Sequence, residues 1–246
     1  MKGIKIMKYT GQLLTSNEKL KKTEYYLFEE MKQKWIIRGI QFLPGTGFCD
    51  GDKLGCLGTC LAFTGFAKRF KSVNKGRKKR NKLFLNDREQ FNRLLIKELT
   101  SLSNKALREN SKLAIRLNIF SSINWDLPEN HIAKNTSIFD YEFPIKIQYY
   151  DYTEKPLSYI LKNQRKNYHL TASHKGNVPG SWEMLKNGIS VAIVKSDYFM
   201  KNQLQYFPPT ITKSHYDGDL NDLRSLDKPA SICWLSEKQS KKALSY

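Results

Sequence analysis

Short apolar runs rich in β-branched residues alternate with helical segments between residues 35 and 236. The runs are WIIRGIQFL (35–43), KLAIRLNIF (112–120), EFPIKIQYYDYT (142–153), YHLTAS (168–173), ISVAIV (189–194), PTITK (209–213) and SICWL (231–235). Strands that alternate with helices pair in parallel through crossover connections. The pattern predicts a single α/β domain of (βα) repeats over 35–236, a partial or complete TIM-like barrel with parallel strands.

Residues 1–34 are polar and Lys-rich, and TSNEKLKKTEYYLFEEMKQK indicates a helix within them. Its apolar stripe would consist of Tyr25, Leu27, Phe28 and Met31. We expect this segment to be a peripheral leader helix, and residues 237–246 to be a polar tail.

The clearest helical pattern follows a basic segment in the middle of the chain. Asn86 is the predicted N-cap, with Glu89 as its capping-box partner. Apolar residues then recur at helical spacing: Phe91, Leu94, Leu95, Leu99, Leu102 and Ala106.

Positive charge is the most unusual bulk property, because 42 Lys and Arg against 23 Asp and Glu give a net charge of +19. Such an excess favours a polyanionic partner such as nucleic acid. An acidic host protein, or a solvated surface that reflects codon bias, are the alternatives. The charge is concentrated in the basic segment 68–82, at Lys68, Arg69, Lys71, Lys75, Arg77, Lys78, Lys79, Arg80 and Lys82.

Three of the four cysteines, Cys49, Cys56 and Cys60, lie in one loop (49–60) with the spacing C-x6-C-x3-C. The sequence has no apolar stretch of the roughly 18 to 20 residues that a membrane helix needs and no secretory signal, so we expect a cytoplasmic protein without a membrane partner. In a reducing compartment clustered thiols indicate metal ligation or redox chemistry rather than disulfides. The lone Cys233 is predicted to be a buried strand residue.

Two kinds of metal site are compatible with this loop. Three thiolates can hold an iron–sulfur cubane with one iron left open. Zinc would need a fourth ligand from elsewhere in the chain, such as His131, His169, His174, His215 or Cys233. Three unligated thiols in a tight Gly-rich turn are the third interpretation.

Polar residues follow or end the predicted middle strands, where parallel α/β proteins bind their ligands. We expect Arg116, Asn118, Asp151, Thr153, His169 and Ser173 to be catalytic, and Ser121, Ser122 and Thr171 to lie in the same pocket. Each of them alone is compatible with an ordinary strand or core residue. Walker A, HExxH, GxSxG and zinc-deaminase motifs are missing from the sequence, which argues against those hydrolase and nucleotide-switch classes.

The order of the three-cysteine loop, KLFLNDREQF, RLNIFSSINW, IQYYDYT, NYHLTAS, GISVAIV and DGDLNDLRSLD resembles an uncharacterised protein family of tailed bacteriophages over roughly residues 35–236. This implies the host cytoplasm as the location. On the motif positions lie Arg116, Asn118, Trp125, Asp151, Tyr152, Thr153, His169, Thr171, Ser173, Asp217, Asp219, Asp222 and Arg224. From the residues alone, DGDLNDLR is compatible with a hard-cation site, with ion pairs to Arg224 or with a surface turn.

More distantly, the chain is similar to the radical S-adenosylmethionine barrel, in which a three-cysteine loop after the first strand ligates a [4Fe-4S] cluster. This resemblance implies that Cys49, Cys56 and Cys60 are the cluster ligands. The spacing differs from the C-x3-C-x2-C of that superfamily, and a G-G-E-like segment is missing, which argues against S-adenosylmethionine as a cofactor.

Two functions follow from these observations. The first is an iron–sulfur enzyme of the radical type that acts on nucleic acid or nucleotides. The second is a non-enzymatic DNA- or RNA-binding protein in which zinc, or no metal, holds the cysteine loop. A host-interaction protein is a third class, and none of them fixes the oligomeric state.

Overall fold

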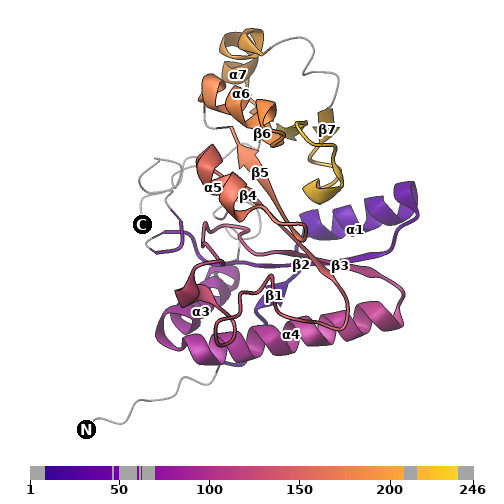
Figure 1. The fold of residues 1–246 in the computed structure, drawn as a ribbon, viewed down its shortest axis with the longest axis vertical. Helices are drawn as coiled ribbons and strands as arrows, with labels where there is room; N and C mark the ends of the chain where they lie inside the picture. Colours follow the sequence, from indigo (N-terminus) through magenta and orange to yellow (C-terminus); the bar gives the residue numbers. More distant parts are fainter. Residues whose placement is uncertain are drawn as a thin grey trace.

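The structure is a computed structural model that describes residues 9–45, 47–49, 60, 62, 70–174, 176–207 and 215–237. Its centre is an eight-stranded sheet with helices on both faces (Figure 1). The strands are β1 (Leu14–Thr15), β2 (Trp35–Ile40), β3 (Lys112–Arg116), β4 (Ile147–Thr153), β5 (Tyr168–Ser173), β6 (Val191–Lys195), β7 (His215–Asp217) and β8 (Ile232–Ser236).

The sheet has the order β1-β2-β3-β4-β5-β6-β8-β7. Neighbours from β2 through β6 to β8 are parallel, as are β8 and β7, whereas β1 is antiparallel to β2. The parallel (βα) architecture is therefore confirmed. The sheet does not close, because β1 and β7 occupy its two edges, so the prediction of a complete barrel is wrong and a partial TIM-like barrel is not confirmed either.

One face of the sheet is covered by most of the helices. These are α3 (Lys71–Asn86), α4 (Arg88–Arg108), α5 (Leu157–Asn163), α6 (Val178–Lys186) and α7 (Asp197–Asn202), with the 3-10 turns η4 (Pro128–Asn130), η5 (Leu204–Tyr206) and η7 (Arg224–Leu226) in connections. Phe91, Leu95 and Leu99 of α4 are fully buried in the main core, as their spacing predicts.

The basic segment is itself helical, which moves the start of the next helix. Asp87 lies between α3 and α4 with φ −147°, and its carboxylate accepts a hydrogen bond from Gln90 N at 2.9 Å. Asp87 is therefore the N-cap, and the prediction of Asn86 is wrong by one residue. The cause is that residues 71–86 already belong to α3.

Helix α1 (Glu18–Met31) packs on the opposite face of the sheet from α4 (Figure 1). Leu20 and Leu27 are buried against Ile37, Ala114 and Tyr150 in a second apolar cluster. The expectation of a peripheral helix is therefore wrong, since α1 covers β2, β3 and β4. The expected stripe is also wrong except for Leu27, because Tyr25, Phe28 and Met31 are exposed.

Other parts of the chain agree with the sequence more closely. Strand β5 has the predicted bounds, and Cys233 is fully buried in β8. The PTITK segment and all but the first residue of the tail lie outside the described residues. Within the described part, no helix combines the length and the apolar character needed to cross a membrane.

Candidate functional site

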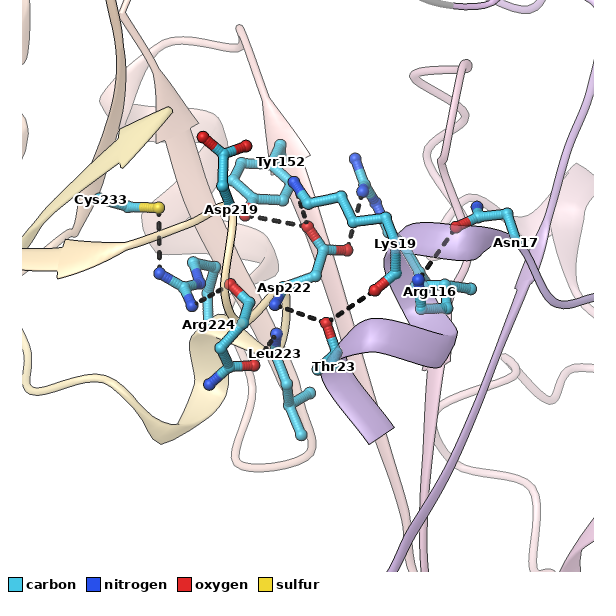
Figure 2. A network of polar contacts seen from close by, with 12 residues as sticks. Asn17, Lys19, Thr23, Arg116, Tyr152, Asp219, Asp222, Leu223, Arg224 and Cys233 are labelled. Atoms are coloured by element: carbon cyan, nitrogen blue, oxygen red, sulfur yellow. Dashed lines mark hydrogen bonds and ion pairs between the residues drawn. The ribbon is translucent and has the colours of Figure 1, made fainter. Parts of the chain in front are cut away.

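The buried carboxylate of Asp222 is the centre of a polar network on the α1 face (Figure 2). Its Oδ1 accepts from Lys19 Nζ at 2.8 Å and from Tyr152 Oη at 3.2 Å. Its Oδ2 accepts from Arg116 Nη1 at 2.9 Å and from Tyr150 Oη at 3.3 Å. The carboxylate therefore holds α1, β3 and β4 together through four donors.

The backbone of Asp222 is also fixed to α1. Its N–H donates to Thr23 Oγ1 at 2.9 Å, and the Thr23 hydroxyl donates to the Lys19 carbonyl at 3.0 Å. Burial alone would raise the pKa of Asp222, but the charges of Arg116 and Lys19 outweigh it and lower the pKa to about 2. Asp222 is therefore ionised at neutral pH.

A second buried ion pair lies beside the first. Arg224 Nη1 is 3.0 Å from an Asp227 carboxylate oxygen and donates to Cys233 Sγ at 3.0 Å. Burial raises the pKa of Asp227 to about 6, although the charge of Arg224 acts against it. Arg224 also lowers the pKa of Asp222, so the two pairs belong to one electrostatic unit.

Strand β5 adds His169 and Thr171 to this face, next to Tyr150 and Tyr152, their Cα partners on β4. Burial lowers the pKa of His169 to about 4, and the charge of Arg224 acts in the same direction, so the imidazole is neutral at pH 7. Within the described residues neither His169 Nε2 nor Thr171 Oγ1 has a hydrogen-bond partner. Both atoms are buried, so in the described part of the chain they are unpartnered polar groups inside this face.

Asp151 forms another cluster on the opposite face of the sheet from α1. Its Oδ1 accepts from Asn118 N at 2.6 Å, and its Oδ2 accepts from Asn118 Nδ2 at 3.2 Å and Tyr168 Oη at 2.9 Å. The Asn118 amide oxygen accepts from Ser121 Oγ at 2.8 Å and Trp125 Nε1 at 3.3 Å. The cluster thus fixes the loop that follows β3.

The carboxylate of Asp151 titrates near neutrality. Burial raises its pKa to about 7, opposed by the backbone hydrogen bond from Asn118 and the charge of Arg116. Such a pKa is suited to proton transfer. The side chain is only 1% exposed, however, and it accepts hydrogen bonds from Asn118 and Tyr168, so the geometry gives it a positioning role.

The six residues expected to be catalytic are divided between these faces, because successive side chains of a strand alternate. The α1 face has Arg116, His169 and Ser173. The other face has Asn118, Asp151 and Thr153. The single pocket expected from the sequence is therefore not formed, and the catalytic roles stay predictions.

Cys49 lies near the carboxyl end of β2, as expected for a loop that follows this strand. Gly45 N donates to its Sγ at 3.3 Å. The preceding carbonyl, that of Phe48, accepts from Ser122 N at 2.7 Å, which joins the cysteine loop to the loop after β3. The thiol is therefore close to the segment that Asn118 fixes.

Cys60 is held at the same end of the sheet. Ala62 N donates to its Sγ at 3.5 Å, and the Ala62 carbonyl accepts from Arg77 of α3. Arg77 also donates to Gln41 Oε1 at 3.1 Å, one residue beyond β2. Cys56 lies outside the described residues, so the three-thiol site stays a prediction.

The described residues contain no group of three or more His, Cys, Asp or Glu side chains that could hold a metal ion. The carboxylates of DGDLNDLR are directed to protein groups instead. Asp217 accepts from Asp219 N at 2.8 Å, and Asp219 accepts from Ser236 N at 2.7 Å. Asp222 is fully buried and forms its ion pairs with Lys19 and Arg116, whereas Arg224 pairs with Asp227. Ion pairs are therefore observed for Asp222, but with other partners than the expected Arg224.

The basic segment forms one surface on α3, which we call the lysine face. Its members are the exposed Lys71, Lys75, Lys78, Lys79 and Lys82. Their positions recur with the helical period, and α3 contains no acidic residue. Lys68 and Arg69 lie outside the described residues.

The two arginines of α3 have a different role from the lysines. Arg77 is only 5% exposed, and Arg80 donates to the carbonyls of Gln12 at 2.9 Å and Gln41 at 3.3 Å. Burial lowers the pKa of Arg77 to about 10, which leaves it charged at neutral pH. These arginines attach α3 to β2 and to the N-terminal segment.

Sequence reasoning did not select Lys19, Thr23 or Tyr150, although all three contact Asp222. A signal was present in α1, where Leu20, Thr23 and Leu27 recur at helical spacing and define a buried face with one polar member. Tyr150 and Tyr152 similarly alternate along β4.

Comparison with known proteins gives a family but no relative of known activity. No curated protein and no solved structure matches the chain, and nothing in the comparisons supports the distant resemblance to the radical S-adenosylmethionine barrel. The family model described as Gene product 88 matches residues 12–245, a range that contains all the described strands and helices. The chain therefore belongs to the Gene product 88 family, in agreement with its resemblance to a phage family.

Proposed function

We propose that the protein binds the phosphate backbone of nucleic acid through the lysine face of α3. The observation that carries the proposal is the presence of five exposed lysines on one side of a helix without acids. From Lys71 to Lys82 the helix rises about 16 Å. The phosphates of one DNA strand are about 3.4 Å apart along the axis, so the two charge densities are comparable.

The helix is also rigidly mounted, which favours a specific surface over a solvated tether. Leu83 and Phe84 are buried in the core, and Arg77 and Arg80 attach the other side of the helix to the sheet. The lysines therefore stay on one side in the free protein. Less ordering entropy is then lost on binding than for a disordered basic tail.

Salt dependence of binding tests the proposal. The variant Lys75→Glu/Lys79→Glu and the wild type would be compared on a labelled duplex between about 50 and 200 mM salt. Each phosphate contact contributes about 0.9 to the slope of log affinity against log salt concentration. We expect the double variant to bind more weakly and to lose about 1.8 of that slope.

The matched control is Lys21→Glu/Lys22→Glu, which makes the same change in net charge on α1, on the other face of the sheet. We expect its slope to stay near that of the wild type. If both double variants lost the same amount of affinity and of salt slope, binding would depend only on net charge, and the proposal would fail. Preference for an acidic polypeptide over nucleic acid would favour a host protein as the partner instead.

A second candidate function is a metal or iron–sulfur centre on Cys49, Cys56 and Cys60, which would provide the radical-type enzyme that the sequence resemblance implies. It is favoured by the two described thiols, which are near the carboxyl end of the same strand and accept backbone N–H bonds. Hydrogen bonds to sulfur are among the features that tune protein-bound iron–sulfur clusters. A bound cluster would supply electron-transfer chemistry at this end of the sheet.

Metal analysis after purification without air tests this candidate. We expect iron and sulfide, with broad absorption near roughly 400 nm, in the wild type and their loss in Cys56→Ala. The control Cys233→Ala removes a thiol that is buried in β8 and should leave the metal content unchanged. Stoichiometric zinc would reassign the site as structural, and a metal-free wild type would refute it.

A further inference from the structure

An open cleft of about 980 Å³ lies between α6 on one side and α7 with η5 on the other. Its lining includes the rings of Trp182, Tyr198 and Tyr206 and the side chain of Lys186. The connections after β5 and β6 lead into these helices, so the cleft is beyond the carboxyl ends of two parallel strands. Parallel α/β proteins commonly bind ligands in this position.

Two of the cleft rings are displayed to solvent. Tyr198 is 67% exposed and Tyr206 is 61% exposed. Rings on the surface of a cleft expose apolar area that a planar ligand can cover. The lining therefore favours a flat, π-bearing ligand.

The wall behind these rings is held in place. Trp182 Nε1 donates to the Tyr206 carbonyl at 3.0 Å, and the Trp182 ring stacks on Phe207 with centroids 6.2 Å apart. These contacts connect α6 with η5 across the cleft. Trp182 is consequently oriented before any ligand arrives.

His174 provides a second connection between the two sides. Its Nδ1 is 2.7 Å from Ser181 Oγ of α6, and its Nε2 is 3.0 Å from Gln203 Oε1. The Gln203 amide nitrogen donates to the Gly176 carbonyl at 3.0 Å, which fixes Oε1 as the group facing the imidazole. Nε2 of His174 therefore carries a proton and donates to Gln203, which keeps Gln203 at the cleft.

We propose that this cleft binds a nucleobase of a single-stranded nucleic acid, stacked on the exposed tyrosines. The proposal rests on the proposed function in taking nucleic acid as the partner, and it adds a separate site. Base stacking on aromatic side chains is tolerant of sequence. Lys186, 5.8 Å from the centre of the Trp182 ring, provides a cation for the adjacent phosphate.

Single-strand binding and Trp182 fluorescence test the proposal together. The probes are a labelled single-stranded oligonucleotide of about 12 residues and the matching duplex. This length is within the range of about 4 to 16 nucleotides that known single-strand-binding domains of the OB-fold class cover. For each of Tyr198→Ala and Tyr206→Ala we expect roughly ten-fold weaker single-strand binding and unchanged duplex binding. The matched control is Tyr25→Ala, which removes an exposed tyrosine of α1.

The oligonucleotide should also quench tryptophan emission, and Trp182→Phe should remove most of this quenching, since Trp35 and Trp125 are buried and Trp234 is partly buried in the core. Unchanged single-strand affinity in both tyrosine variants, or quenching by an oligosaccharide but not by the oligonucleotide, would overturn the proposal. The double variant Lys75→Glu/Lys79→Glu tests the lysine face separately from the cleft. If the lysine face does not bind nucleic acid, this variant should keep its duplex and single-strand affinities. The tyrosine variants of the cleft should still lose single-strand affinity and keep duplex affinity.

Discussion

The carboxylate of Asp222 is fully buried and forms ion pairs with two cations, Lys19 and Arg116 (Figure 2). We expect Asp222→Asn to lower the free energy of unfolding by about 3 to 5 kcal/mol at pH 7, since Arg116 and Lys19 lose their counter-charge. Urea denaturation would measure this. Glu30→Gln, at an exposed position of α1, is the control and should change stability by less than about 0.5 kcal/mol.

The pH dependence of this loss follows from the pKa of Asp222. Its folded value of about 2 is below the ordinary 3.8, so its stabilisation is present above about pH 4 and is lost as the pH falls toward 2. The difference between wild type and Asp222→Asn should shrink over that range. A difference that stayed constant from pH 5 to about pH 2 would contradict the ionised network.

Asp151 should have the opposite pH dependence. Its folded pKa of about 7 is above the ordinary 3.8, so the folded state binds more protons and stability falls as the pH rises from about 4 to 7. Asp151→Asn keeps the size and shape of the side chain and removes its ionisable carboxyl group. We expect the variant to gain stability relative to wild type across this range, by at most about 4 kcal/mol at pH 7.

Urea midpoints at several pH values would measure this relative gain. Using the difference between the two proteins removes the contribution of His169, whose lowered pKa acts in the same pH range with the opposite sign. A difference independent of pH would show that Asp151 keeps an ordinary pKa. Loss of stability at all pH values would show that the negative charge itself holds the Asn118 loop.

At the scale of elements, α1 is the clearest departure from the sequence prediction. We expect Leu27→Ala to destabilise the protein by about 2 to 5 kcal/mol, because it opens a cavity between α1 and the sheet. Tyr25→Ala on the outer side of the same helix should change stability by less than about 0.5 kcal/mol. Thermal denaturation followed by circular dichroism measures both, and equal small effects would mean that α1 is peripheral after all.

Sequence patterns predicted elements well where one physical cause dominated. The helical spacing of apolar residues in α4, the YHLTAS run of β5 and the β-branched run of β6 each reflect burial of one side of an element, and these elements were found correctly. The face of α1 was misjudged because the large aromatic residues Tyr25 and Phe28 outweighed the actual stripe, which contains Thr23. Hydrophobicity alone does not reveal that the Thr23 hydroxyl accepts a hydrogen bond from the backbone of Asp222.

The candidate sites depend on pairing between distant residues, which the sequence does not encode locally. The sequence placed Asn118, Asp151 and Arg116 at the same end of the sheet, and Asn118 does bind Asp151. Arg116 lies on the other face, and this separation depends on which face each strand residue occupies. Asp222 was assigned to a motif without its contacts, because its partners are on α1, β3 and β4. The cleft beside Trp182 likewise depends on the packing of three separate segments, α6, α7 and η5.

At the scale of the whole molecule, the described parts form one continuous sheet with cores on both faces. We expect a single cooperative transition, in which urea midpoints from far-ultraviolet circular dichroism and from tryptophan emission coincide. The tryptophans sample different regions, with Trp35 in β2, Trp125 after β3, Trp182 in α6 and Trp234 in β8. Separate transitions for the two probes would show that the sheet divides into independent units.

The bond between Asp222 N and Thr23 joins residues 199 positions apart. On a ribosome that adds roughly 5 to 20 residues per second, the helix that carries Thr23 is made about 10 to 40 seconds before Asp222 exists. During that interval Lys19 and Arg116 have no counter-charge from this carboxylate, and the inner side of α1 has no partner from the segment between β7 and β8. The α1 face therefore reaches its final form only after the segment that contains Asp222 has been made.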